Sequence, residues 1–341
     1  MTRALVTGCA GFIGSNLTDR LLAMGHTVVG VDCFDDYYER AAKESNLALA
    51  QSSPRFVLEE RSLQQLATAP GSTQGRSELE RLLDDVACVF HLAGQPGVRG
   101  SWGRSFGRYV DNNILATQAV LEAASAAGVA RVVYASSSSV YGDQPALPLR
   151  EDMLPIPRSP YGVTKLAAEQ LCGLYDASGR VSTTALRFFT VYGPRQRPDM
   201  AFHRFMTALG GGQSISVFGD GYQTRDFTYV DDIVDALIAA MEQAASGVIN
   251  IGGGNRVSLL EAIATLGEVM GVEPRLELLP AQAGDVRDTL ADVSHAEALL
   301  GFRPKVRLGE GLGRQWNWYR GSASMPQLRV SPSSSGITAS Q

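Results

Sequence analysis

Several features that would place a chain in a familiar class are missing from these 341 residues. No run of about 18 apolar residues occurs, so we expect no membrane-spanning helix. Cysteine is scarce: the four are Cys9, Cys33, Cys88 and Cys172, and no two form a C-x-x-C pair. This spacing argues against a zinc site and favours reduced thiols over disulfides. The four histidines are scattered as well, and we expect no metal site.

An excess of basic charge is also missing. The net charge is -5 at pH 7, so no basic field is available to attract nucleic acid. The first residues, MTRALVTGCAGFIG, run into glycines without a cleavage-site pattern, so we expect no signal peptide and a cytoplasmic location. The composition that remains is that of an ordinary globular protein, with 45% hydrophobic and 19% charged residues.

Apolar strands alternate with helical segments in the first half of the chain. The pattern predicts strands over 4–8, 27–32, 88–94 and 131–137, and helices over 12–25 and 110–128. Buried strands that alternate with helices are typical of a parallel sheet with helices on both faces. We therefore predict an α/β fold of the Rossmann type, with a doubly wound parallel sheet.

The second half has a different pattern. It predicts a helix over 161–179, a strand and turn over 182–194, a strand over 214–219 and a helix over 230–244, separated by Pro- and Gly-rich loops. We predict a cofactor-binding domain over 1–188, to which some later segments return, and a smaller substrate-binding region over 189–320. The polar stretch 61–80 is predicted to be a loop, and 321–341 a disordered tail.

A glycine-rich turn, GCAGFIG, joins the first strand to the first helix. Gly8, Gly11 and Gly14 allow a tight turn and let backbone N–H groups approach a pyrophosphate at the helix N-terminus. Asp32 ends the second strand, where its carboxylate can accept hydrogen bonds from ribose hydroxyls and would repel a 2'-phosphate. The sequence therefore predicts an NAD site, the alternative being a purely structural turn with a surface aspartate.

The stretch YGVTK places Tyr161 and Lys165 four residues apart, on one face of a helix. An ammonium near a phenol favours the phenolate, so we expect Lys165 to lower the pKa of Tyr161. A phenolate of this kind is a general base for a sugar hydroxyl. The alternative is an ordinary amphipathic helix, because Y-x-x-x-K is common by chance.

The spacing G-x-x-G-x-x-G, followed in order by a serine-ended strand and Y-x-x-x-K, resembles the extended short-chain dehydrogenase/reductase family. The resemblance implies that Ser137, three residues before the valine of VYG, is the third catalytic residue with Tyr161 and Lys165. It also implies cofactor contacts from the glycine turn, from FVLEERS (56–62) and from HLAGQPG (91–97). These contacts are Gly8, Gly11, Phe12, Ile13, Gly14, Asp32, Glu60, Arg61, Leu92, Ala93, Tyr161 and Lys165. Glu60 and Arg61 depart from the usual aspartate and aliphatic residue of the family.

The serine run ASSSS (135–139) separates the reactions of the family. In members that dehydrate a nucleotide sugar, the two positions after the catalytic Ser or Thr carry Asp and Glu. In relatives that decarboxylate UDP-glucuronate, a Glu precedes VYG. Ser138 and Ser139 stand at these positions here, and neither can act as a carboxyl acid or base. The resemblance therefore implies oxidation followed by return of the hydride, which is epimerisation.

The stretches RFFTVYGPRQRPDM (187–200) and QPGVRGS (95–101) are similar to those of UDP-glucuronate 4-epimerases. The resemblance implies that Thr190, Ser138 and Ser139 hydrogen-bond a sugar carboxylate, with Arg197 as its charge partner. A solvated basic loop is the alternative for Arg195 and Arg197. The expected substrate contacts are Arg99, Ser138, Ser139, Thr190, Arg197, Arg225, Asp285 and Arg287, with Arg225 as the diphosphate clamp. Gln282 stands where some epimerases have a phosphate-binding arginine.

Three rival functions follow from the same pattern. UDP-glucose 4-epimerase is the nearest, although such enzymes usually carry Asn at the position of Thr190. UDP-glucuronate decarboxylase conflicts with Ser139, and a non-catalytic NAD-binding protein conflicts with the complete Ser137, Tyr161 and Lys165 set. The family also implies a homodimer formed by two helices per subunit, here over 110–127 and 161–178.

Overall fold

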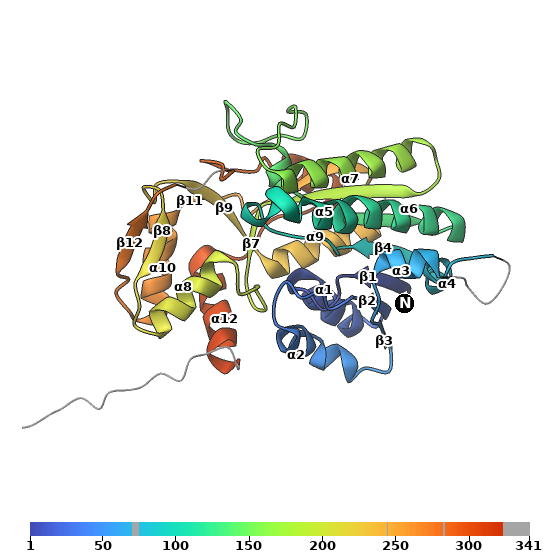
Figure 1. The fold of residues 1–341 in the computed structure, drawn as a ribbon, viewed down its shortest axis with the longest axis horizontal. Helices are drawn as coiled ribbons and strands as arrows, with labels where there is room; N and C mark the ends of the chain where they lie inside the picture. Colours follow the sequence, from blue (N-terminus) through green and yellow to red (C-terminus); the bar gives the residue numbers. More distant parts are fainter. Residues whose placement is uncertain (70–74, 244, 282–283, 323–341) are drawn as a thin grey trace, which may run out of the picture.

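Seven parallel strands form the central sheet of the computed structural model (Figure 1). The structure describes residues 1–69, 75–243, 245–281 and 284–322. The strand order is β10-β6-β5-β4-β1-β2-β3. The strands are β1 (Arg3–Thr7), β2 (Thr27–Val31), β3 (Phe56–Glu59), β4 (Val86–His91), β5 (Arg131–Ser137), β6 (Ser182–Phe188) and β10 (Gly247–Ile251). The predicted doubly wound α/β fold is confirmed.

Helices cover both faces of this sheet because neighbouring residues of each buried strand point to opposite sides. Ala4 and Val6 of β1 pack in one core with the first set of helices, and Leu5 packs in a second core with the other set. The first set is α1 (Phe12–Ala23), α2 (Arg40–Gln51) and α9 (Val230–Glu242). The second is α3 (Leu63–Thr68), α4 (Glu78–Leu82), α6 (Ala116–Ala127) and α7 (Pro160–Ala177).

The chain reverses its winding direction between β1 and β4, which are neighbours in the sheet. At such a switch point the connections leave the strand ends in opposite directions and open a crevice at their carboxyl ends. The glycine turn follows β1 directly. The fold therefore places the predicted cofactor turn at the edge where a ligand crevice is expected.

Two small sheets, beside the main one, carry the second half of the chain (Figure 1). Their strands are β7 (Thr190–Tyr192), β8 (Ile215–Phe218), β9 (Thr224–Tyr229), β11 (Arg256–Ser258) and β12 (Leu276–Leu279). The helices of this part are α8 (Ala201–Gly210), α10 (Leu259–Met270) and α12 (Leu308–Gly321). The helix α11 (Ser294–Leu300) packs against β10 and α9 of the main sheet. The strand β10 returns to the main sheet beside β6. Whether the two parts act as separate domains stays a prediction.

Three sequence expectations need correction. The segment 61–80 is not simply a loop: α3 and α4 lie in it, because Ser62 and Gln65 form a capping box and Ser77 caps the second helix. The expected helix over 110–128 begins earlier, at α5 (Phe106–Tyr109), and passes through a π-helical segment, η3 (Val110–Leu115), before α6. The segment 182–194 divides into β6 of the main sheet and β7 of a small sheet. Of the expected tail, 323–341 lies outside the described residues.

Three short 3-10 turns, η1 (Arg99–Ser101), η2 (Gly103–Ser105) and η4 (Ser138–Val140), complete the secondary structure used below. Within the described residues we find no helix long and apolar enough to cross a membrane. The same residues contain no group of three or more His, Cys, Asp or Glu side chains suited to a metal ion.

Candidate functional site

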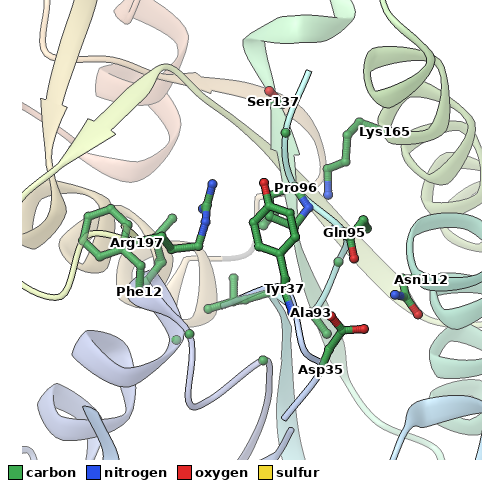
Figure 2. Close-up of a pocket in the computed structure, with 18 of the residues that line it drawn as sticks. Phe12, Asp35, Tyr37, Ala93, Gln95, Pro96, Asn112, Ser137, Lys165 and Arg197 are labelled. Atoms are coloured by element: carbon green, nitrogen blue, oxygen red, sulfur yellow. Dashed lines mark hydrogen bonds between the residues drawn. The ribbon is translucent and has the colours of Figure 1, made fainter. Parts of the chain in front are cut away.

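A cavity of about 420 Å³ lies at the carboxyl ends of the central strands (Figure 2). Its walls come from the glycine turn, the ends of β2, β4 and β5, the start of α7, and the β7 segment. Sixteen of the predicted site residues line it: Gly8, Gly11, Phe12, Ile13, Gly14, Asp32, Arg61, Leu92, Ala93, Ser137, Ser138, Ser139, Tyr161, Lys165, Thr190 and Arg197. The structure therefore brings the predicted cofactor and catalytic residues together in one cavity.

The glycine turn forms a close backbone cradle at the N-terminus of α1. Gly8 has a φ of +69°, which favours glycine, and a Cβ on Gly14 would lie only 2.1 Å from the Gly8 carbonyl oxygen. A Cβ on Gly8 would also lie 2.9 Å from the Ala93 nitrogen. The cradle leaves the first N–H groups of the helix facing an open cavity. This arrangement fits a pyrophosphate group, as the sequence predicts.

Asp32 lies beside the cradle and is nearly buried. Its carboxylate accepts hydrogen bonds from the backbone nitrogens of Ala10, at 3.1 Å, and Phe34, at 2.8 Å. The Lys43 ammonium is 3.8 Å from the same carboxylate and donates to the Asp35 carbonyl oxygen at 2.9 Å. Lys43 lines the cavity but was not predicted. A helical lysine gives no signal in the sequence that its side chain folds back into a site.

Two buried polar residues hold the loop after β4 in place. The Thr7 hydroxyl oxygen accepts hydrogen bonds from the backbone nitrogens of Leu92 and Ala93, at 3.1 and 3.0 Å. Asn113, on η3, accepts from the Gln95 nitrogen at 2.6 Å and donates to the Thr164 hydroxyl of α7 at 2.9 Å. Asn113 therefore fixes one cavity wall relative to the catalytic helix. Sequence reasoning did not identify it, because an asparagine in a helical stretch is usually at the surface.

The first turn of α7 carries Tyr161. Ser159 caps the helix by accepting a hydrogen bond from the Gly162 nitrogen at 3.1 Å, and Pro160 occupies the first helical position. A Cβ on Gly162 would lie 2.5 Å from the Ser139 carbonyl oxygen. Glycine at this position therefore lets residues 137–139 at the end of β5, here called the serine turn, approach the helix closely. Figure 2 shows Ser137 and Lys165 on the same side of the cavity, with Arg197 across from them.

Ser137 has one hydrogen-bond partner for its oxygen and one for its proton. Its hydroxyl oxygen accepts from the backbone nitrogen of Ser139 at 3.1 Å. Its proton is then available to the Tyr161 oxygen, and this hydrogen bond lowers the pKa of Tyr161. Ser137 therefore lies in the relation to Tyr161 that a proton relay needs.

We expected Lys165 to lower the pKa of Tyr161. Among the protein's own groups this prediction is wrong, because the pKa of Tyr161 is raised. Burial raises the pKa of Tyr161, and the opposing influences come from the Ser137 hydrogen bond and the Arg197 charge. Burial also lowers the pKa of Lys165, to about 7. Both side chains are shielded from water, and the cost of removing water from a charged group outweighs the attraction that the sequence suggested.

Arg197 and Arg195 have different environments. Arg197 lines the cavity, and its guanidinium donates to the Asp199 carboxylate through Nε at 3.0 Å and Nη2 at 3.1 Å. Arg195 instead pairs with Asp19 of α1 at 2.6 Å. The two arginines therefore do not form one solvated basic loop. Arg197 faces the site, together with Ser138, Ser139 and Thr190.

A second cavity, of about 200 Å³, adjoins the first and shares its Ser138, Ser139 and Thr190 walls. Arg225 and Asp285 line it, as expected for the nucleotide end of a substrate. Arg225 donates to the carbonyl oxygens of Thr224, at 2.8 Å, and Arg287, at 3.0 Å. These two bonds fix the guanidinium at the cavity wall.

Three predicted residues line neither cavity. Glu60 is exposed and pairs with Arg40 through two hydrogen bonds of 2.7 and 2.8 Å. Arg287 pairs with Asp220 at 3.1 Å. Arg99 pairs with Asp285 at 2.7 Å, and so supports a residue that does line the second cavity. The Gln282 position lies outside the described residues.

Comparison with known proteins agrees with this geometry. A model of the NAD dependent epimerase/dehydratase family matches residues 4–252. An uncharacterized UDP-glucose epimerase, YtcB of Bacillus subtilis (strain 168), is 41% identical over 91% of the chain and 95% of its own length. The UDP-glucuronate 4-epimerase of Thermodesulfobacterium geofontis (strain OPF15) is 37% identical over 92% and 95%. The crystal structure of UDP-glucuronic acid 4-epimerase from Bacillus cereus, in complex with UDP-glucuronic acid and NAD, superposes with a TM-score of 0.87 at 41% identity, over 94% of this chain and 99% of that one.

Proposed function

The chain belongs to the NAD dependent epimerase/dehydratase family, and from this premise we propose that it converts UDP-glucuronate to UDP-galacturonate by 4-epimerisation. One observation carries the proposal. The cavity that contains Ser137, Tyr161 and Lys165 also contains the serine turn, Thr190 and Arg197. A proton-transfer set therefore faces a set of groups suited to a carboxylate.

The cofactor's place follows from the residues that line the cavity. The Gly8–Gly14 cradle would hold the pyrophosphate of NAD, and Asp32 the adenosine ribose. When bound, NAD supplies the acceptor and then the donor of the hydride at C4 of the sugar. Lys165 would hold the nicotinamide ribose by its ammonium group. Arg61 lines the same cavity, and we assign it to the adenosine end.

Tyr161 acts as the base that takes the proton of the sugar 4-hydroxyl, and later as the acid that returns it. Ser137 shares this proton, because its hydroxyl is hydrogen-bonded to the tyrosine. Between the two proton transfers the 4-keto sugar turns about its diphosphate link and presents its other face. Arg225 and Asp285 would hold the nucleotide in the second cavity meanwhile.

The serine turn has a second task in this reaction. Oxidation at C4 gives a β-keto acid, which loses carbon dioxide when the bond to the carboxylate stands perpendicular to the ketone plane. Hydrogen bonds from Ser138, Ser139 and Thr190 would hold the carboxylate away from that orientation. Arg197 would stabilise its charge. The residues thus favour return of the hydride over loss of carbon dioxide.

The test is proton NMR of the purified protein with UDP-glucuronate, with and without added NAD. We expect UDP-galacturonate as the product in both cases, because a reaction without net redox change keeps its NAD. The Tyr161→Phe variant is the control and should be inactive while retaining NAD. A UDP-pentose or 4-keto pentose would contradict the proposal. No reaction with any UDP-sugar, despite bound NAD, would favour a non-catalytic role.

UDP-glucose 4-epimerase is the second candidate, because a relative with 41% identity is described as a UDP-glucose epimerase. The same NMR assay with UDP-glucose separates the two. Conversion of UDP-glucose without conversion of UDP-glucuronate would replace the first proposal with the second. Thr190 and Arg197 at the cavity wall favour the uronate.

A homodimer in the cytoplasm completes the proposal. The helices α6 and α7 lie side by side on one face of the sheet (Figure 1). Leu115, Val163 and Leu174 on this helical layer are 49%, 48% and 66% exposed, which supports a partner surface there. The four cysteine thiols are free, as is usual in a reducing cytoplasm.

A further inference from the structure

Glu169 lies one helical turn after Lys165 on α7 and is buried against the central sheet. Its carboxylate accepts three hydrogen bonds. One comes from the Ser136 hydroxyl at 2.7 Å, and two come from Arg187, through Nε at 3.0 Å and Nη2 at 2.5 Å. Ser136 and Arg187 are register partners on β5 and β6. The Glu169 carboxylate therefore links α7 to β5 and β6 at two residues that are paired in the sheet.

Stability alone does not explain a charged pair at this place. The side chains of Arg187 and Glu169 are 3% and 1% exposed. Removing two charges from water costs several kcal/mol per ion, and well-packed apolar residues often serve the fold equally well. The position of the pair next to the catalytic groups is the more informative feature. Ser136 directly precedes Ser137, and Lys165 is on the same helical face as Glu169.

The surroundings of the Lys165 ammonium contain few charges. Its nitrogen lies over the ring of Tyr134 on β5, 4.4 Å from the centroid, and His91 of β4 is close enough for the lysine charge to lower the histidine's pKa. Tyr161 and Cys172 share its helix, and burial raises the pKa of both. These groups are therefore neutral near pH 7.

Charged groups near this ammonium come from the Glu169–Arg187 pair. Burial lowers the pKa of Lys165, and Cys172 and Glu169 oppose this lowering. Of these two groups, Glu169 is the carboxylate. The Arg187 guanidinium extends over the ring of Tyr141 at 4.6 Å. Glu169 shares α7 with Lys165, one helical turn away, whereas Arg187 reaches the carboxylate from β6.

We propose that Glu169 is a positioning residue: it fixes the β5 end that carries Ser137 against the helix that carries Tyr161, and its charge keeps Lys165 protonated. The consequence for catalysis rests on the proposed epimerase function. The effect on Lys165 does not, because it can be measured without any sugar. In the proposed mechanism a protonated Lys165 holds the cofactor ribose through its ammonium group.

The chain allows a direct measurement, because its three lysines are Lys43, Lys165 and Lys305. Protein labelled with [6-13C]lysine and carrying its NAD should give three ε-carbon resonances in the NMR spectrum. The resonance that is lost in Lys165→Met belongs to Lys165. We expect Glu169→Gln to move the titration midpoint of Lys165 down by about one pH unit or more. Glu169→Asp keeps the charge and should recover most of the shift. Ser136→Ala is the matched control: it removes one hydrogen bond but no charge, and should leave the midpoint in place.

Activity gives a second readout if the proposed reaction is observed. As the pH is raised, the rate should begin to fall at a lower pH in Glu169→Gln than in the wild type, because Lys165 loses its proton earlier. A folded Glu169→Gln variant with an unchanged Lys165 midpoint would overturn the proposal. If this variant does not fold, Glu169→Gln/Arg187→Met removes both buried charges, and an unchanged midpoint there would overturn it equally. A shifted midpoint in a protein that converts no UDP-sugar would contradict the epimerase function alone.

Discussion

The imidazole of His91 and the hydroxyl of Thr7 form a hydrogen bond of 2.8 Å between two central strands. The Thr7 oxygen already accepts two backbone N–H groups, so its own proton must go to Nδ1 of His91. Nε2 then carries the ring proton and donates to Thr117 at 2.9 Å, while Thr117 donates to the Asn113 carbonyl oxygen at 2.7 Å. This chain of bonds is complete only when the imidazole is neutral.

The neutral His91 predicts an acid-dependent loss of stability. Burial lowers the pKa of His91 to about 3, from an ordinary value near 6.5. Because the unfolded state binds the proton more readily, the free energy of unfolding falls as the pH drops below about 6.5, and levels off near the folded value. The His91→Gln variant cannot titrate. Between pH 7 and pH 5 it should lose about 2 kcal/mol less stability than the wild type, measured by urea unfolding at a fixed NAD concentration.

Thr117→Val is the control for this prediction. It removes the acceptor for Nε2 but keeps the imidazole, so stability should fall at every pH while the acid-dependent loss remains. Identical pH dependence in His91→Gln and the wild type would show that His91 does not stay neutral in the folded state.

The glycine cradle predicts a steric effect of Gly14→Ala. The added Cβ would lie 2.1 Å from the Gly8 carbonyl oxygen, a backbone atom that cannot move aside cheaply. We expect a loss of about 1–3 kcal/mol in the free energy of unfolding. The purified variant should contain little NAD, measured by absorbance after denaturation. Gly107→Ala, where the Cβ meets nothing within 4 Å, should retain the wild-type NAD content. Full NAD content in Gly14→Ala would contradict the assigned cradle.

The position of Arg197 predicts that its substitution weakens the binding of UDP-glucuronate more than that of UDP-glucose. A hydrogen bond to an ionised group contributes about 1.5–3 kcal/mol, so Arg197→Met should weaken UDP-glucuronate binding about 10- to 100-fold. Binding of UDP-glucose should change little, as measured by calorimetry. Arg197→Met also leaves the Asp199 carboxylate without its arginine, with the Tyr37 hydroxyl still donating to it at 3.2 Å, and this carboxylate would repel the one on the sugar. The Arg197→Met/Asp199→Asn variant separates the two effects and should recover only part of the affinity.

The exposed Arg204 on α8 provides the matched control. Arg204→Met should bind both sugars like the wild type. Equal losses of affinity for UDP-glucuronate and UDP-glucose in Arg197→Met would place Arg197 away from the sugar carboxylate.

The variants Thr190→Ala and Arg197→Ala test whether these residues hold the sugar carboxylate. Extra UDP-pentose from either variant would support that role. If those variants give no extra UDP-pentose and bind UDP-glucuronate as tightly as the wild type, the results would contradict that role.

The sequence predicted those features of the candidate site whose geometry depends on local spacing. Gly8, Gly11 and Gly14 form a close turn because a strand ends and a helix begins around them, and Tyr161 and Lys165 share a helical face. The parallel sheet then brings these segments to one edge, since the carboxyl ends of its strands meet there. Such features follow from period and order alone.

Long-range contacts and the removal of water from buried groups could not be predicted from the sequence. Lys43 reaches Asp32 because α2 packs back against α1 and β3, and Arg195 meets Asp19 of α1 from a distant part of the chain. The pKa of Tyr161 rises because of burial, which depends on everything packed around it. Glu60 matched a family position, yet its side chain pairs with Arg40 at the surface. No pattern within a strand or helix specifies these pairings.

The exposed apolar residues of α7 predict the dimer surface. Val163 and Leu174 are eleven residues apart, about three helical turns, and so lie on one face; Leu115 is on the adjacent helical segment. Burying a leucine contributes about 1.5–3 kcal/mol, and a two-fold axis counts each residue twice. Leu174→Glu should therefore weaken the dimer about 100-fold or more, giving monomers at micromolar concentration in light scattering. Leu49→Glu on α2, where the leucine is 64% exposed, is the matched control and should leave the dimer intact. If Leu174→Glu remains dimeric while Leu49→Glu dissociates, the interface lies on the α2 face of the sheet instead.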